Sequence, residues 1–151
     1  MINLMLGDCL ERMKEIPDGS VDMVMTDPPY GTTACKWDSV ITLEPMWEQL
    51  KRVIKPSGAI VMTASQPFTT TLIASNMKMF KYCWVWKKQK PTNFYQVKWQ
   101  PLKDHEDIVV FCDGKPRYYP QGTKEVSVKN GRKNKSSNIY SKYDGGNYIQ
   151  K

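Results

Sequence analysis

The sequence has few of the residues that build disulfide frameworks or metal sites. Its 151 residues include four cysteines, at positions 9, 35, 83 and 112, and a single histidine. No two cysteines are close enough to form the paired ligands of the usual zinc sites or a disulfide framework, so we predict no metal site. This cysteine usage best suits a reducing, cytoplasmic setting.

Long apolar runs are also missing. None approaches the roughly 20 residues that a membrane-spanning helix needs, and the N-terminal Met-Ile-Asn-Leu lacks the basic region of a signal peptide. We therefore expect neither a membrane segment nor a leader. With 40% hydrophobic and 25% charged residues, the chain can bury the core of one ordinary domain.

Carboxylates are absent from one long stretch of the chain. Residues 51–103 hold ten Lys or Arg and no Asp or Glu, a net charge of +10, whereas residues 1–50 carry −6 and residues 104–151 carry +3. A long basic stretch indicates a polyanionic partner, with nucleic acid the first candidate. On charge alone, a solvated basic face is an equally good interpretation.

Short apolar segments alternate with amphipathic ones over most of the chain. Strands are predicted over 2–6, 21–26, 59–64, 80–87 and 106–112, and helices over 9–16, 43–54 and 67–77. Asp8 is placed to cap the first helix, with Glu11 reaching back to it. The largely apolar 21–26 strand is expected in the interior of the sheet. This alternation is typical of an α/β fold, a sheet with parallel strands flanked by helices.

The alternating pattern fades after residue 113. Residues 120–151 consist mainly of Asn, Ser, Lys, Gly and Tyr, with few aliphatic side chains to build a core. We therefore divide the chain into a structured part, residues 1–113, and a polar extension, residues 114–151.

The second predicted strand runs directly into residues 26–31, Thr-Asp-Pro-Pro-Tyr-Gly. Two consecutive prolines donate no backbone hydrogen bond, so the strand ends there and a loop begins. In an open α/β sheet, ligands bind at the carboxyl ends of the strands. The loop offers the Asp27 carboxylate, free proline carbonyls and the Tyr30 ring, which suit a planar group bearing an amino substituent. A proline-stiffened turn is the alternative.

Several segments together resemble the amino-group DNA methyltransferases, in the circularly permuted, β-type order and of the phage or bacterial type. The resemblance rests on residues 7–9, 16–22, 26–31, 50–61 and 105–111. It covers about residues 3–113 and implies methyl transfer from S-adenosylmethionine to adenine N6 or cytosine N4 of DNA, on a Rossmann-like sheet. It also implies that residues 1–113 are catalytic and that residues 114–151 begin a target-recognition region.

The resemblance assigns catalysis to Asp27, Pro28, Pro29 and Tyr30. Asp27 and the Pro28 carbonyl would hold the two amino hydrogens of a flipped base, and Tyr30 would stack on that base. Aspartate rather than serine at position 27 favours adenine. Asp27 is also counted, with Asp8, among the residues that contact the cofactor, and a simple helix cap is at least as good an interpretation of Asp8.

A basic and aromatic stretch follows in the second half of the chain. Three lysines, Lys87, Lys88 and Lys90, lie among five aromatic residues, at positions 84, 86, 94, 95 and 99. This composition predicts contact with DNA, with surface or core packing as the alternative. The single histidine, His105, is expected to orient a loop.

The sequence departs from the family pattern in one respect. None of its nine glycines forms the glycine-rich turn after a strand that approaches the cofactor, so the expected sheet is a partial one. Three interpretations stay open: a shortened methyltransferase, one part of a split enzyme, or a DNA-binding remnant without activity. Missing strands would leave an open sheet edge, which favours a homo-oligomer or a complementary C-terminal half as partner.

Overall fold

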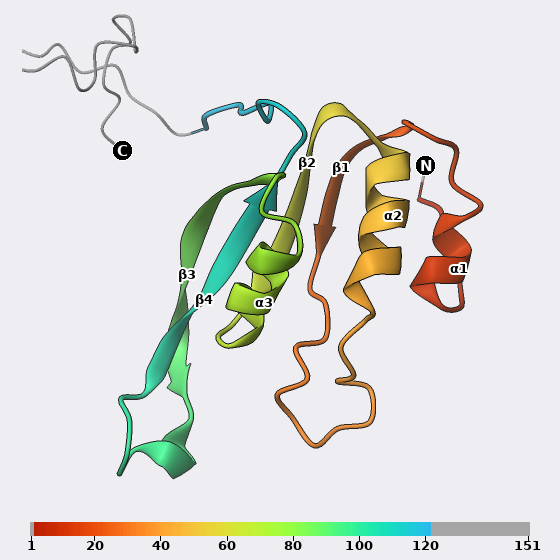
Figure 1. Cartoon of the computed structure of the whole chain (residues 1–151). Helices are drawn as coiled ribbons and strands as arrows, with labels where there is room; N and C mark the ends of the chain where they lie inside the picture. Colours follow the sequence, from red (N-terminus) through yellow and green to blue (C-terminus); the bar gives the residue numbers. More distant parts are fainter. Residues whose placement is uncertain (1, 122–151) are drawn as a thin grey trace, which may run out of the picture. The chain divides into compact units, whose positions relative to one another are not determined.

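The structure is a computed structural model that describes residues 2–121. The chain divides into two compact units, Met1–Arg117 and Tyr118–Lys151. All helices and strands named below lie in the first unit, and Figure 1 shows their arrangement. The polar extension predicted over residues 114–151 lies mostly outside the described residues.

A four-stranded sheet forms the centre of the first unit. Its strands are β1 (Val21–Thr26), β2 (Ile54–Ala64), β3 (Phe80–Thr92) and β4 (Lys103–Phe111), in the spatial order β1-β2-β4-β3. β1 and β2 are parallel, whereas β4 runs antiparallel to both of its neighbours. The predicted α/β sheet is therefore confirmed, as a mixed sheet. Because β1, β2 and β3 run in the same direction, their carboxyl ends lie at the same end of the sheet.

Three α-helices accompany the sheet. They are α1 (Cys9–Met13), α2 (Leu43–Val53) and α3 (Phe68–Ser75), and a short 3₁₀ turn, η1 (Phe94–Gln96), lies between β3 and β4. α2 forms where the sequence predicts it, because its apolar residues recur along one face of the helix. No helix among residues 2–121 is both long and apolar enough to cross a membrane.

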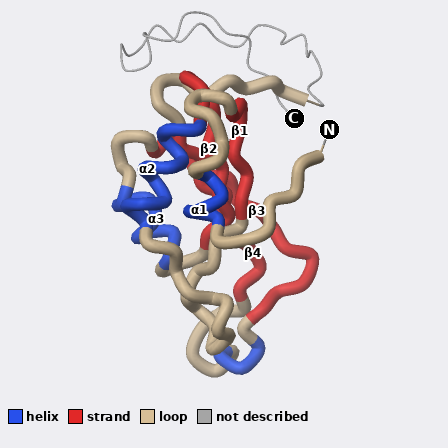
Figure 2. Tube along the Cα trace, turned by 90° about the vertical axis from the view of Figure 1, so that its right-hand side faces the viewer, coloured by secondary structure: helices blue, strands red, loops and turns tan. Residues whose placement is uncertain are grey.

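The core lies between the sheet and these helices. Ile60 and Met62 of β2 are completely buried, and so are Val109 and Phe111, which pair with them on β4. Trp47 of α2 meets Phe111 edge to face, with ring centroids 4.7 Å apart. Figure 2 shows α2 and α3 on the same side of the strands. The helices therefore bury one face of the sheet.

The other face of the sheet has no helix over it within the described residues (Figure 2). Its side chains alternate along each strand with the buried ones. The large apolar members that are at least 36% exposed are Met23, Met25, Tyr82, Trp84 and Trp86. We call this surface the open face. Because it gathers several large apolar side chains, the open face is a surface suited to a covering layer.

Two predictions about the N-terminal part are wrong. Residues 2–6 form no strand, and Leu4 and Leu6 are 90% and 98% exposed. A strand needs a neighbour for its backbone hydrogen bonds, and no described strand pairs with this segment. β1 spans the predicted residues 21–26 but lies at the edge of the sheet instead of its interior, because no described strand pairs with its outer side.

β2 begins five residues earlier than predicted. Residues 56–58, Pro-Ser-Gly, do not end the strand but form a bulge in it, because the pairing passes from Val21–Ile54 to Met23–Ala59. Ser57 has a left-handed backbone, with φ 63°, and a Cβ at Gly58 would lie 2.7 Å from the Ile54 side chain. The tripeptide alone has the composition of a turn, and only the pairing with β1 continues it as a strand.

The remaining elements occur in their predicted places with different ends. The helix predicted over 67–77 spans Phe68–Ser75, and the one predicted over 9–16 ends at Met13. β3 continues five residues past its predicted end, and β4 begins three residues before its predicted start. The two strands extend each other because they pair as a long hairpin.

Candidate active site

The loop after β1 places the predicted catalytic residues at the end of the sheet where the carboxyl ends of β1, β2 and β3 lie. Residues 27–30 follow β1 directly, and Pro28 is buried while Asp27 is exposed. The loop lines an open pocket of about 250 Å³. Its lining consists of Asp27, Pro28, Pro29, Tyr30, Thr32, Thr33, Trp37 and Asp38. The prolines end the strand, and the cavity forms where the chain turns away from the sheet.

Two hydroxyl groups fix the Asp27 carboxylate. The Tyr30 hydroxyl donates to Oδ1 of Asp27 at 2.8 Å, and the Thr63 hydroxyl, from the end of β2, donates to the same oxygen. No donor to Oδ2 is found among residues 2–121. One carboxylate oxygen is therefore held in place while the other can accept a hydrogen bond from a ligand. Thr63 was not among the predicted site residues, because only the pairing of β1 with β2 brings it close to Asp27.

Tyr30 is held at both ends of its side chain. Its ring stacks on Phe68 of α3, with centroids 5.4 Å apart and planes 22° apart. Burial raises the pKa of the Tyr30 hydroxyl, and the hydrogen bond to Asp27 raises that pKa further. The hydroxyl therefore stays protonated and acts as a donor. Since Phe68 occupies one face of the ring, a planar ligand can stack only on the opposite face.

Asp38 is a second carboxylate that the sequence analysis missed. Its oxygens accept backbone N–H groups from Gly31, Thr32 and Thr33 at 2.9, 2.9 and 2.6 Å. Gly31 has φ 68°, a left-handed conformation that glycine adopts without strain. Burial tends to raise the pKa of Asp38, but the donors at Gly31 and Thr33 outweigh it and lower that pKa to about 2. Asp38 thus closes the loop behind residues 27–30.

Replacing Asp38 with Asn should loosen the loop. The amide loses the negative charge that the three N–H groups stabilise, so we expect hydrogen exchange at residues 31–33 to become roughly tenfold faster or more. In the wild type, the pKa of Asp38 is lowered by folding, so Asp38 stabilises the loop fully above about pH 4, the ordinary aspartate pKa. This stabilisation is lost as the pH falls toward 2. Amide NMR spectra recorded between pH 5 and pH 2 measure both effects.

Asp22 provides the matched control for this prediction. Its exposed carboxylate pairs with Lys55 at 2.7 Å and makes no contact with the loop. Asp22→Asn should leave the exchange of residues 31–33 unchanged. Equal exchange rates in wild type and Asp38→Asn would show that Asp38 does not organise the loop.

Asp8 caps α1, as one of its two interpretations predicts. Its Oδ1 accepts the backbone N–H of Leu10 at 2.8 Å. The predicted return contact from Glu11 is absent, because Glu11 pairs with Lys14 at 2.8 Å. The cap is therefore observed, while a contact of Asp8 with the cofactor stays a prediction.

The three predicted DNA-binding lysines lie on β3 in two different environments. Lys87 and Lys90 are exposed, and neither forms an ion pair within residues 2–121. Lys88 pairs with Glu106 of β4, and both side chains are largely buried. His105, on β4, contacts its neighbour Asp104 at 3.2 Å. An attraction for phosphate therefore rests on Lys87 and Lys90 more than on Lys88.

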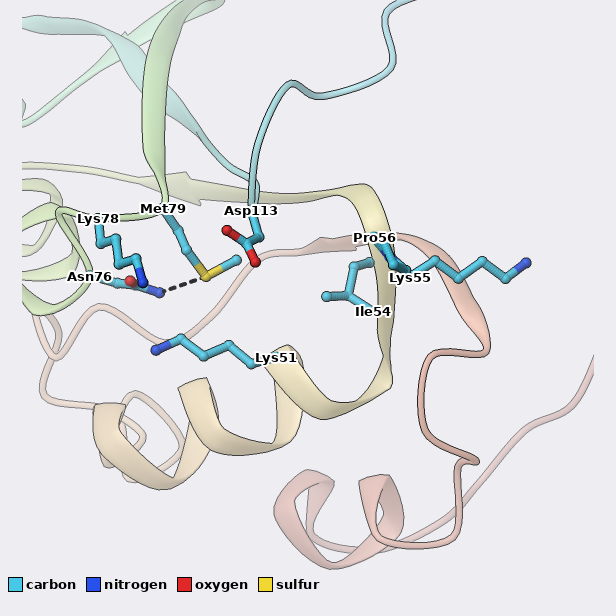
Figure 3. Close-up of a pocket in the computed structure, with 8 residues that line it drawn as sticks. All are labelled: Lys51, Ile54, Lys55, Pro56, Asn76, Lys78, Met79 and Asp113. Carbon is cyan, nitrogen blue, oxygen red and sulfur yellow. Dashed lines mark hydrogen bonds between the residues drawn. The ribbon is translucent and has the colours of Figure 1, made fainter.

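A second cavity lies at the opposite end of the sheet, near the amino ends of β2 and β3. It has about 340 Å³ and is lined by Lys51, Ile54, Lys55, Pro56, Asn76, Lys78, Met79 and Asp113 (Figure 3). Figure 3 shows Lys55 extending away from the other labelled side chains, while Asn76 donates to the Met79 sulfur at 3.3 Å. These residues belong to the end of α2, the start of β2, the segment before β3 and the residues after β4, so this cavity is separate from Asp27.

Comparisons with known proteins point to one group of enzymes. Residues 21–150 match the model of the N6/N4 methyltransferase family, described as DNA methylase. The type II methyltransferase M.BglII of Bacillus subtilis is 43% identical over 60 aligned positions, which cover 36% of this chain and 17% of that protein.

Solved structures of low sequence identity share the fold. The cytosine-N4-specific PvuII DNA methyltransferase has a TM-score of 0.57 and 14% identity, over 74% of this chain and 49% of that one. The M1.HpyAVI–SAM complex has a TM-score of 0.59 and 18% identity, over 87% of this chain and 62% of that one. The chain thus spans about half to three-fifths of these structures, and a smaller part of M.BglII.

Proposed function

The chain belongs to the N6/N4 family of DNA methylases, and from this premise we propose that it performs the base-side chemistry of methyl transfer to DNA. The family uses S-adenosylmethionine as methyl donor. The acceptor would be the exocyclic amine of a base flipped out of the duplex, because the amine is inaccessible within the base stack.

The environment of Asp27 is the observation that carries this proposal. An exocyclic amine is a poor nucleophile, because its lone pair is delocalised into the ring. A carboxylate oxygen and the Pro28 carbonyl can accept its two hydrogens and draw the nitrogen toward tetrahedral geometry. Asp27 suits this role, since Tyr30 and Thr63 hold one of its oxygens and leave the other for the amine. The residues thus orient the acceptor, and the methyl group comes from the bound donor.

We propose adenine N6 as the acceptor and cytosine N4 as the alternative. Aspartate at position 27 supports adenine, while the PvuII structure shows that the same fold serves a cytosine-N4-specific enzyme. We also propose residues 1–113 as the catalytic part and residues 114–151 as the start of a target-recognition region. The cofactor-binding turn would come from additional polypeptide, because no glycine-rich turn follows a strand within residues 2–121.

The product in DNA identifies the reaction. We would express the chain, together with a polypeptide that carries the glycine-rich cofactor turn, in a bacterial host without DNA methylation, and analyse the nucleosides of the host DNA by mass spectrometry. N6-methyladenine is the expected product. N4-methylcytosine would correct the base assignment, and the absence of both, with soluble protein present, would contradict the proposed function.

A further inference from the structure

The turn of the β3–β4 hairpin lies at the same end of the sheet as the catalytic loop. β3 runs parallel to β1 and β2 through its pairing with β4, so its carboxyl end lies where β1 reaches Asp27. Figure 1 shows the far end of the hairpin and the loop after β1 at the same end of the molecule's first unit. We call residues 93–100 the hairpin tip. The tip and the candidate active site can therefore face one ligand.

The hairpin tip exposes three large aromatic side chains. Tyr95 is 96% exposed, Trp99 is 81% exposed and Phe94 is 63% exposed. The local fold holds them there: Asn93 adopts a left-handed backbone with φ 69°, and the Trp99 N–H binds the Gln96 carbonyl at 2.9 Å. Exposed aromatic residues gathered in this way mark an interaction site.

The charge around the hairpin tip indicates which kind of partner it binds. From residue 87 to residue 103 the hairpin carries five lysines and no carboxylate. Of these, Lys88 pairs with Glu106, whereas Lys87 and Lys90 are exposed, although Lys87 lies close enough to Asp104 of β4 to interact with its charge. A positively charged arm that ends in aromatic rings matches a polyanion with stackable bases better than an apolar protein surface. Nucleic acid is the partner that this chemistry fits, and the proposed function makes it duplex DNA.

We propose that Tyr95 inserts into the base stack of duplex DNA, at the gap that a flipped base leaves, while Lys87 and Lys90 bind the flanking phosphates. This inference rests on the proposed function, which requires the base to leave the stack. A flipped base leaves its neighbours without a stacking partner, and an inserted aromatic side chain replaces the lost contacts. Tyr95 would thus be a positioning residue that holds the duplex open, not a catalytic one.

Binding to a gapped duplex tests the wedge without any methyl transfer. The 151-residue chain is titrated, in the absence of methyl donor, into a fluorescent duplex with one abasic site and into the intact duplex of the same sequence. Because the abasic site is already open, we expect roughly tenfold tighter binding to it, in the range of one base–aromatic stack. Tyr95→Ala should abolish this preference, whereas Tyr95→Phe should keep it because the ring remains.

Two further variants make the test specific. Tyr82→Ala removes an exposed tyrosine from the base of the same hairpin and should keep the abasic preference. The double variant Lys87→Gln, Lys90→Gln should also keep it, but should reduce the slope of log binding constant against log salt by roughly 1.8, for two lost phosphate contacts. Circular dichroism confirms that each variant is folded.

The possible outcomes separate this inference from the proposed function. Equal binding to both duplexes, or a preference that survives Tyr95→Ala, would overturn the wedge even if the chain forms part of an active methyltransferase. A preference that depends on Tyr95 supports the wedge even if the host DNA contains no methylated base, a result that would count against the proposed function alone.

Discussion

Asp27→Ala should reduce methyl transfer by roughly 10²–10³-fold, if the lost acceptor is worth as much as one preorganised donor of an oxyanion hole. The variant removes the group that accepts hydrogens of the amine, and it leaves the core untouched because Asp27 is exposed. The rate would be measured with radiolabelled methyl donor on the chain combined with a polypeptide that carries the glycine-rich cofactor turn. Thermal unfolding should change little, since only the contacts of Tyr30 and Thr63 with the carboxylate are lost.

Asp22→Ala is the control for this substitution. Asp22 lies on β1, the strand that precedes Asp27, is exposed and pairs with Lys55, so the control removes a carboxylate without touching the loop. Its transfer rate should stay within about twofold of wild type, as is usual for a surface substitution. A wild-type rate in Asp27→Ala would end the assignment of this residue, whereas equal losses in both variants would point to a general electrostatic effect.

The purified 151-residue chain should transfer no methyl group by itself. The described site holds only the base-side groups, and a flexible donor that is not fixed near the amine loses the proximity that supplies much of the rate. Addition of a polypeptide that carries the glycine-rich turn should restore transfer from background to a measurable turnover. A radiolabelled transfer assay, with the added polypeptide alone as the control, measures this.

The open face gives this prediction a structural readout. A complementary polypeptide that completes the fold should cover the exposed side chains of β1 and β3, and should lower the fluorescence of a dye that binds apolar surface. Robust turnover by the chain alone on adenine-containing DNA would contradict the prediction. Dye release without any transfer would instead favour the interpretation as a DNA-binding remnant.

Local sequence patterns correctly predicted the helices and strands that are specified by their own residues. The apolar stripe of α2 and the proline stop after β1 are such patterns, and both elements lie within one residue of their predicted bounds. The strand predicted over residues 2–6 failed because its existence depends on a neighbour, and the apolar pattern does not say whether one is present. The bulge at residues 56–58 was missed for a related reason, since pairing with β1 overrides the turn composition.

The sequence predicted only part of the candidate site, because the other part depends on contacts between distant segments. Asp27 and Tyr30 belong to one short motif, so the sequence places them together. Thr63 lies 36 residues away and reaches Asp27 only through the β1–β2 pairing. Asp38 is closer in sequence, but its three hydrogen bonds depend on the backbone path of residues 31–33, including the left-handed Gly31. No side-chain pattern encodes that path.

The position of β4 in the sheet has a consequence for synthesis on the ribosome. β4 lies between β2 and β3, so neither of these strands has its shared neighbour until residue 111 has been made. At roughly 5–20 residues per second, the ribosome needs several seconds to add the residues between the end of β2 and the end of β4. During that interval one edge of the nascent β2 is unpaired. A chaperone that shields extended segments would therefore act on this protein before β4 is made.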